Sequence, residues 1–290
     1  MNRTDSAPPA KKLPAAFWCQ FLPPFAWMGI LYLLPILMLL SYAFMRHEYV
    51  HVHREFTLEN FVAMFSNIGY RNTMLRTLEV AGLVTLINAL LAFPVAHFLA
   101  FHAGRYKNLL TVLVLLPLWS SYLVRVFSWR IILGYNGVLN KFLVMTGILE
   151  QPTTLFLYNQ FSVTLTLCYV WLPFMILPLI TAFERLPRRL LEASADLGGG
   201  PFTTFRRVVF PLVLPGLLAG ALSVFSLTMG DYITPQLVGG SGEIMIGNLV
   251  ASQFGVAANW PLGSAFALLV LLVVFILMAV LSRKGVLENL

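Results

Sequence analysis

The sequence predicts an all-α integral membrane protein with six transmembrane helices. Of its 290 residues, 59% are hydrophobic and only 11% are charged, whereas a soluble domain carries about 25% charged residues. The hydrophobic residues also gather in long runs without charges, each close to the ~20 residues that cross a bilayer as a helix. These runs lack the alternation over about 10 residues that a membrane β-barrel requires. Helices are therefore expected, since backbone polar groups in lipid must pair within their own segment.

The six predicted spans cover residues 22–44, 75–101, 108–130, 161–183, 208–230 and 263–283. The first run is longer than the apolar core of a signal peptide and has no convincing cleavage site, so we expect it to be retained. Residues 1–16 are polar and contain three prolines, Pro8, Pro9 and Pro14. We predict a disordered cytoplasmic lead over 1–16 and a single transmembrane domain over 17–290.

The distribution of positive charge predicts that both termini are cytoplasmic. With the N-terminus inside, 12 of the 19 Lys and Arg residues fall on the inner side: Arg3, Lys11, Lys12, Arg105, Lys107, Arg185, Arg188, Arg189, Arg206, Arg207, Arg283 and Lys284. Cytoplasmic loops of membrane proteins carry this excess. The net charge of +7 therefore reflects membrane orientation, and no soluble basic face for nucleic acid is predicted.

Three outer segments separate the spans. In residues 46–72, Thr57 is a candidate helix cap and Phe61, Met64 and Phe65 have helical spacing, which predicts a short helix on the outer surface. Residues 130–160 form a long loop in which glycines separate short apolar pieces, and residues 231–262, interrupted by glycine and asparagine, are predicted as a loop with short helices.

The letters "HEYVH" at residues 47–51 match a zinc-protease motif. That site needs a helix with both histidines on one face. The surrounding "HEYVHVHRE" instead alternates with period two and is rich in valine, which favours an extended segment. No metal site is predicted.

The longest inner loop, residues 184–207, predicts a helix–turn–helix hairpin. Pro187 suits the first helical position, Gly198 suits a left-handed cap, and Pro201 suits the start of a second helix. The first helix has a partly apolar face formed by Leu190, Leu191, Ala195 and Leu197. Both a solvated loop and a docking surface for a cytoplasmic partner agree with this pattern.

This loop resembles a motif of known transporters. "EASADLGGGPFTTFRRVVFPLVLPG" is similar to the EAA loop of binding-protein-dependent ABC importer permeases, with Ser194 where a second alanine is usual. Four further stretches resemble the polyamine (spermidine/putrescine) branch, and within it the first permease subunit. They are "LPLWSSYLVRVFSWRIIL" (116–133), "YVWLPFMILPL" (169–179), "GDYITPQLVGG" (230–240) and "NWPLGSA" (259–265).

The resemblance implies a type I ABC importer permease fold in the bacterial inner membrane. It implies a heterodimer with a second homologous permease, two copies of a cytoplasmic ATPase, and a periplasmic binding protein that delivers the solute. The implied ATPase-coupling residues are Glu192, Ala193, Ser194, Asp196, Leu197, Gly198 and Pro201. The chain lacks a G-x-x-x-x-G-K-[ST] phosphate loop, so we expect it to be no enzyme and to leave ATP and Mg to the ATPase.

Candidate residues for the solute path are Asp231, Tyr232, Tyr169, Trp171 and Glu243. Carboxylates and aromatic faces both attract ammonium groups, as a polyamine path requires. Each tryptophan is also typical of an interfacial belt, and Asp231 is equally suited to contact the binding protein. Arg125 and Arg130 place positive charge near the expected entrance, which keeps another small solute, amino-acid-like or phosphonate, as an alternative.

An ion-coupled secondary transporter is the rival class of function. It predicts carboxylates or broken helices at mid-membrane depth and an internal repeat. The predicted spans have no carboxylate at their centres, and a docking loop has no role in that mechanism. The sequence therefore favours the importer.

Overall fold

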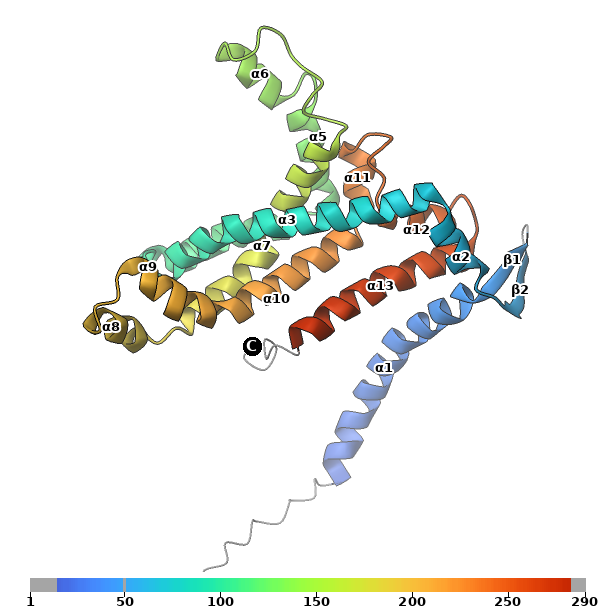
Figure 1. Ribbon diagram of the computed structural model, residues 1–290, viewed down its shortest axis with the longest axis horizontal. Coiled ribbons are helices and arrows are strands. Elements are labelled where there is room, and N and C mark those ends of the chain that lie inside the picture. The colour runs from blue at the N-terminus through green and yellow to red at the C-terminus, as the bar shows by residue number, and fades with distance from the viewer. Residues whose placement is uncertain (1–14, 49–50, 283–290) are drawn as a thin grey trace, which may run out of the picture.

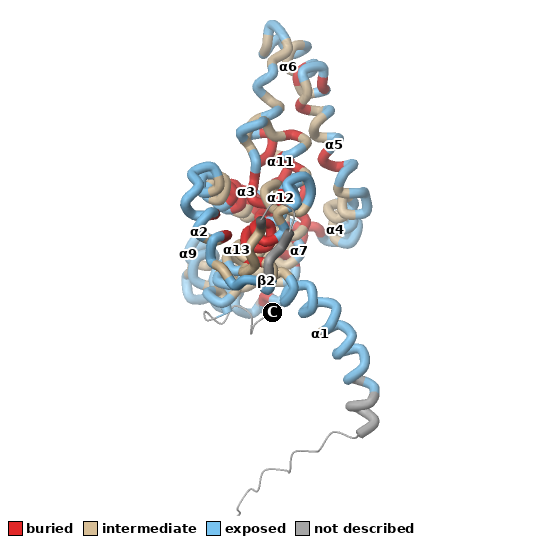
Figure 2. The backbone as a smooth tube through the Cα atoms, turned by 90° about the vertical axis from the view of Figure 1, so that its right-hand side faces the viewer, coloured by how far each residue is buried: buried red, intermediate tan, exposed pale blue. Residues whose placement is uncertain are grey.

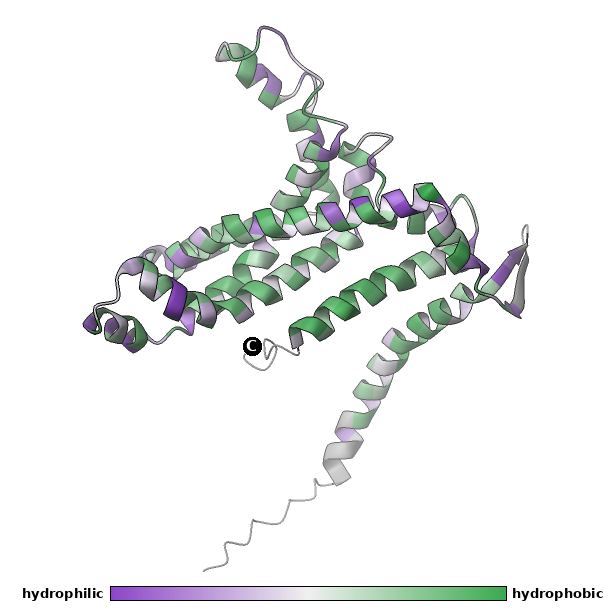
Figure 3. Cartoon of the chain, in the orientation of Figure 1, coloured by the Kyte–Doolittle hydropathy of each residue, from purple (hydrophilic) through white to green (hydrophobic). Residues whose placement is uncertain are grey.

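The computed structural model describes residues 15–48 and 51–282. Of the lead predicted over 1–16, only the last two residues are described, and they begin the first helix, α1 (Ala15–Ala43). Four further helices are long and apolar enough to cross a membrane: α3 (Ile68–Phe101), α7 (Gln160–Glu184), α10 (Phe210–Met229) and α13 (Trp260–Ser282). Figure 3 shows hydrophobic residues along most of α13, whereas hydrophilic residues lie among them in the first turns of α3.

The second helix begins earlier than residue 75, where the sequence placed it. The side chain of Asn67 caps α3, because its Oδ1 accepts hydrogen bonds from the backbone N–H groups of Gly69 (2.8 Å) and Tyr70 (3.3 Å). The helix has 34 residues and is therefore about 51 Å long, more than the ~30 Å of a bilayer core. Its first turns extend beyond the hydrocarbon.

The third predicted span, 108–130, is broken near Pro117 into two helices. A 3₁₀ turn (Gly104–Tyr106) leads into α4 (Lys107–Leu115), and a second 3₁₀ turn (Leu116–Trp119) separates it from α5 (Tyr122–Leu133). The two halves are bent by 91°. Pro117 lacks the N–H that would continue the helix, and the backbone of Ser120 is extended, with ψ 151°. The described residues therefore hold five spanning helices, or six if the broken pair counts as one.

The broken pair changes the shape of the molecule. α5 packs against α7 and α11, and beyond it α6 (Val138–Met145) projects away from the bundle (Figure 1). The long segment between α5 and α7 thus contains one short helix, α6, which was not predicted from the sequence.

The segment after α1 confirms the extended prediction and adds a small sheet to an otherwise helical chain. Strands β1 (Met45–Glu48) and β2 (His51–Phe56) form an antiparallel hairpin that pairs His47 with Val52 and Glu48 with His51. His47 and His51 therefore lie on different strands and not on one helix face.

The short helix predicted for the same segment is confirmed as α2 (Glu59–Ser66). Thr57 is not the cap, because Leu58 occupies that position, but Thr57 Oγ1 still accepts from the Glu59 N–H at 3.2 Å. Asn60 attaches α2 to the end of α1 and the start of β1, because its Nδ2 donates to the carbonyls of Ala43 and Met45, both at 2.9 Å. Met64 is buried and Phe65 is exposed.

The core lies where α3, α7 and α10 pack together, and α7 is the central helix (Figure 2). By contrast, α1 is exposed along its length, and it contacts α13 near one end. Two short helices, α11 (Ile233–Val238) and α12 (Ile246–Phe254), lie between α10 and α13. Between α7 and α10 come α8 (Arg188–Asp196), α9 (Pro201–Thr204) and a π-helical turn (Phe205–Val209).

Glycines allow the close crossing of α7 and α10. A Cβ on Gly216 would lie 2.5 Å from Ala182 Cβ and 2.7 Å from the Pro178 carbonyl oxygen. A Cβ on Gly220 would lie 2.8 Å from Met175 Sδ. Small residues at such contacts let membrane helices approach closely, since lipid provides no hydrophobic force to press them together.

Gly216→Ala should therefore separate α7 from α10. We expect a loss of about 1–3 kcal/mol in the free energy of unfolding, as for other overpacked cores, measured as a lower melting temperature of the purified protein in detergent. Gly82→Ala in α3 is the matched control, because a Cβ there meets nothing within 4 Å. Equal melting temperatures for both variants would contradict the close-packing argument.

Candidate functional site

The hairpin α8–α9 has the geometry that the sequence predicts at its turn. Gly198 has φ +76°, the left-handed conformation that glycine adopts without strain. The N–H groups of Leu197, Gly198 and Gly199 return to the carbonyls of Ala193 (3.1 Å), Ala195 (2.9 Å) and Ser194 (2.8 Å). The carbonyls at the end of α8 are thereby satisfied, and the chain reverses tightly.

The start of the hairpin differs slightly from the prediction. Pro187 is the cap of α8 and not its first helical residue, while Pro201 begins α9 as expected.

Ser194, which departs from the usual motif, holds the two arms of the hairpin together. Its Oγ lies 2.8 Å from Thr204 Oγ1, in a hydrogen bond between α8 and α9. Gly199 must pass close to it, since a Cβ there would lie 2.6 Å from Ser194 Oγ and 2.7 Å from its carbonyl oxygen. An alanine at position 194 would lack this bond. The serine therefore stiffens the turn.

The tip of the hairpin is apolar and exposed. Leu197 is 89% exposed and Phe202 is 74% exposed, and Glu192, Ala193 and Asp196 are exposed beside them. Leu191, on the other side of α8, packs against the core. Two large apolar side chains at an exposed tip are typical of an interaction surface.

Asp231 lies at the other end of α10, in the turn before α11. It is buried, with 7% of its surface exposed. Its Oδ1 accepts from the backbone N–H groups of Ile233 (2.9 Å) and Thr234 (3.1 Å). Its Oδ2 accepts from the Thr234 hydroxyl (2.8 Å) and from the Tyr122 hydroxyl. The carboxylate thus orders the start of α11 and ties it to α5.

Burial raises the pKa of the Asp231 carboxyl above its usual range, because a buried charge loses its hydration. The hydrogen bonds from Tyr122, Thr234 and Ile233 oppose this rise. A cation placed beside the carboxylate would oppose it further.

A pocket of about 310 Å³ adjoins Asp231. Its lining residues are Tyr122, Trp171, Ser226, Leu227, Gly230, Asp231, Tyr232 and Ile233. The rings of Tyr122 and Trp171 are stacked, with centroids 5.5 Å apart and planes at 14°. Three of the residues predicted for the solute path, Asp231, Tyr232 and Trp171, therefore line one pocket. With Tyr122, the pocket holds one carboxylate and three aromatic side chains in all.

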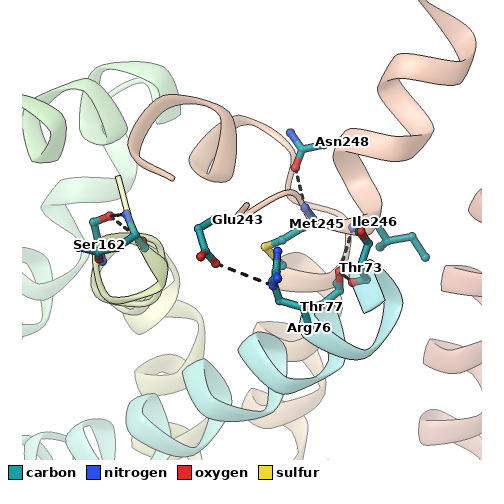
Figure 4. Close-up of polar contacts among 9 residues, drawn as sticks. Thr73, Arg76, Thr77, Ser162, Glu243, Met245, Ile246 and Asn248 are labelled. Carbon is teal, nitrogen blue, oxygen red and sulfur yellow. Dashed lines mark hydrogen bonds and ion pairs between the residues drawn. The ribbon is translucent and has the colours of Figure 1, made fainter. Parts of the chain in front are cut away.

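The other two predicted path residues do not line this pocket. Tyr169 packs its ring against Trp129, with centroids 5.4 Å apart. Glu243 forms an ion pair with Arg76 of α3, with Oε2 3.9 Å from Nε (Figure 4).

The contacts around Glu243 join four helices, α3, α7, α11 and α12. The Ile246 N–H at the start of α12 donates to Thr77 Oγ1 at 2.9 Å (Figure 4). On the other side, Ser162 of α7 donates through Oγ to the Val238 carbonyl at 2.7 Å. The segment from α11 to α12 is thereby fastened to both α3 and α7.

Sequence reasoning missed Tyr122 and Thr234. Tyr122 falls inside the predicted span 108–130, and the break after Pro117 brings it to Asp231. The signal was present in "PLWSSY", where a proline and two serines interrupt an apolar run. Arg125, one turn further along α5, is buried and donates through Nη1 to the Val170 carbonyl at 3.3 Å.

The bundle of long apolar helices, the exposed hairpin α8–α9 before α10 and the pocket at Asp231 after it define a membrane-embedded subunit of a transporter. Residues 89–284 match the family described as "Binding-protein-dependent transport system inner membrane component", and the chain belongs to this family. It is a permease of an ABC importer and a multi-pass protein of the inner membrane.

Particular relatives match nearly the whole chain. It is 40% identical to "Inner membrane ABC transporter permease protein YdcU" of Escherichia coli (strain K12), over 99% of this chain and 98% of that protein. It is 35% identical to "Spermidine/putrescine transport system permease protein PotB" of Haemophilus influenzae, over 91% of this chain and 92% of that protein.

Solved structures confirm the type I importer fold. A bacterial ABC transporter that imports the acidic polysaccharide alginate has a chain similar to this one, with a TM-score of 0.71 at 17% identity, covering 92% of this chain and 95% of that chain. The alginate transporter in complex with its pentasaccharide-bound periplasmic protein gives a TM-score of 0.73 at 15% identity, covering 93% and 95%.

Proposed function

We propose that this permease forms half of the translocation path for a polyamine such as spermidine or putrescine. The observation that carries the proposal is the buried carboxylate of Asp231 in a pocket with the rings of Tyr122, Trp171 and Tyr232. A carboxylate and aromatic faces together suit a chain of ammonium groups. The names of the PotB relatives, at 33–35% identity, support the same solute.

The proposal includes the partners that the resemblance implies. A second, homologous permease completes the path as a heterodimer, and a periplasmic binding protein delivers the solute. Two copies of a cytoplasmic ATPase bind ATP and Mg, so this chain is itself no enzyme and carries no cofactor. The structures of alginate transporters support this general arrangement.

The hairpin α8–α9 is the proposed contact with the ATPase. Leu197 and Phe202 form its apolar tip, while Glu192, Ala193, Ser194, Asp196, Gly198 and Pro201 shape the turn and its helices. α10 begins after this hairpin and ends before Asp231, and its 20 residues span about 30 Å. With the hairpin and both termini in the cytoplasm, the pocket therefore lies toward the periplasmic side.

A second candidate is another small solute, amino-acid-like or phosphonate. Buried Arg125 favours it, because its guanidinium lies 5.9 Å from the centre of the Tyr122 ring and adds positive charge near the pocket. The chain also resembles "Molybdenum transport system permease protein ModB" of Azotobacter vinelandii, at 31% identity over 57% of this chain.

The direct test is the ATPase activity of the complex that copurifies with this chain, measured in lipid with its binding protein. Spermidine, putrescine, amino acids and phosphonates are titrated separately. We expect stimulation by a polyamine. Stimulation only by another solute would support the importer function but rule out a polyamine as its solute. The absence of any copurifying ATPase would contradict the docking role of α8–α9.

Gly198→Val should uncouple the permease from its ATPase. A β-branched side chain at φ +76° strains the turn by roughly 1–2 kcal/mol, so the tip no longer meets the ATPase in the right orientation. We expect a severalfold lower ratio of solute transported to ATP hydrolysed in proteoliposomes.

Gly200→Val is the control for this variant. Gly200 has φ −68° and ψ 168°, which valine adopts readily, and a Cβ there meets nothing within 4 Å. Equal coupling ratios in the two variants would show that the left-handed turn at Gly198 is not required.

Asp231→Asn should slow polyamine uptake without preventing assembly. The amide keeps an oxygen that can cap α11 but loses the negative charge, so we expect a roughly tenfold lower uptake rate, in line with the loss of a hydrogen bond to a charged group. The yield of intact complex is measured in parallel. Glu150→Gln, at an exposed carboxylate after α6, is the control. Unchanged uptake kinetics would remove Asp231 from the path.

A further inference from the structure

The two oxygens of the Asp231 carboxylate have different kinds of partners. Oδ1 is bound by the backbone N–H groups of Ile233 and Thr234, which belong to the first turn of α11. Oδ2 is bound by two side-chain hydroxyls, those of Thr234 and Tyr122. Oδ1 therefore caps the first turn of α11 and cannot exchange its partners without disturbing that helix. The hydroxyl partners of Oδ2 can rotate away and be replaced by another donor.

Tyr122 connects Asp231 to two other helices. It is the first residue of α5, directly after the 91° break. Its hydroxyl also lies 2.7 Å from Thr234 Oγ1, and its ring stacks on Trp171 of α7. The same ring and the same carboxylate line the pocket of about 310 Å³. A solute in this pocket would therefore meet both residues of the Tyr122–Asp231 hydrogen bond.

We propose that Tyr122 is a positioning residue that competes with the solute cation for Asp231 Oδ2. This inference rests on the proposed role of Asp231 in the path. Without solute, the hydroxyl supplies a donor to a carboxylate that water reaches poorly, which limits the cost of burying the charge. An arriving ammonium replaces it, since the ammonium brings a full positive charge to the carboxylate, whereas the phenol hydroxyl is neutral.

The competition also explains how the pocket releases its solute. When the ammonium moves on, the Tyr122 hydroxyl returns to Oδ2 and again satisfies the carboxylate. Buried Arg125, whose guanidinium lies near the Tyr122 ring, adds a like charge that disfavours a long stay of the cation. Tyr122 thus weakens binding at Asp231 so that the solute passes.

The test is the kinetics of spermidine uptake by the whole complex in proteoliposomes, with the loaded binding protein varied. Tyr122→Phe keeps the ring and its stacking on Trp171 but removes the hydroxyl. We expect slower release, so that kcat and KM for the loaded binding protein both fall, by on the order of tenfold, while kcat/KM stays nearly constant. A purely structural role would lower kcat without lowering KM.

Tyr158→Phe is the matched control. It removes a hydroxyl that accepts from Arg130 of α5 at 3.2 Å but does not reach Asp231, and we expect wild-type kinetics. If Tyr122→Phe does not assemble, Thr234→Val removes the other hydroxyl on Oδ2 with little change of shape, and the same joint fall is expected.

The outcomes separate this inference from the function on which it rests. Unchanged kinetics in Tyr122→Phe, or a fall in kcat without a fall in KM, would show that Tyr122 does not compete with the solute. If Asp231→Asn is slow in the same experiment, the solute path through Asp231 still stands. If Asp231→Asn is itself unchanged, the path through Asp231 fails, and the inference fails with it.

Discussion

The close crossing of α7 and α10 is the contact on which the rest of this permease depends. Gly216 and Gly220 let the two backbones approach until a single added carbon would collide with Ala182, Pro178 or Met175. In lipid, such packing must stabilise the bundle without a hydrophobic force between helices. Because the hairpin α8–α9 joins these two helices and Asp231 follows α10, their crossing positions both ends of the molecule.

The broken helix pair α4–α5 determines what the pocket contains. A straight third span would have carried Tyr122 through the membrane among apolar neighbours. The break after Pro117 instead places Tyr122 beside Asp231 and Trp171, and beyond α5 the chain projects away from the bundle as α6 (Figure 1). A local loss of one backbone donor thus creates a contact between residues more than a hundred positions apart.

The polar groups near α11 and α12 balance order against mobility. Ser162, Thr77 and Arg76 fasten the segment between these helices to α7 and α3 through two hydrogen bonds and one ion pair. Asp231 adds backbone bonds that order α11 and side-chain bonds that can exchange. In a low-dielectric surrounding, each exchange must replace one donor by another, because an unpaired buried carboxylate is costly. A solute with its own donors meets that requirement.

The sequence by itself determined the membrane class, the extended segment near His47 and the turn at Gly198. It also placed five of the six spans to within a few residues, apart from the earlier starts of α1 and α3. Each of these follows from local physics: hydrophobic length, period-two alternation, or the left-handed conformation of glycine. Only the tertiary structure decided which polar residues meet. Asp231, Tyr232 and Trp171 came together, Glu243 paired with Arg76, Tyr169 packed on Trp129, and Tyr122 entered the pocket. These contacts depend on how the helices cross and where one breaks, and long-range packing sets both.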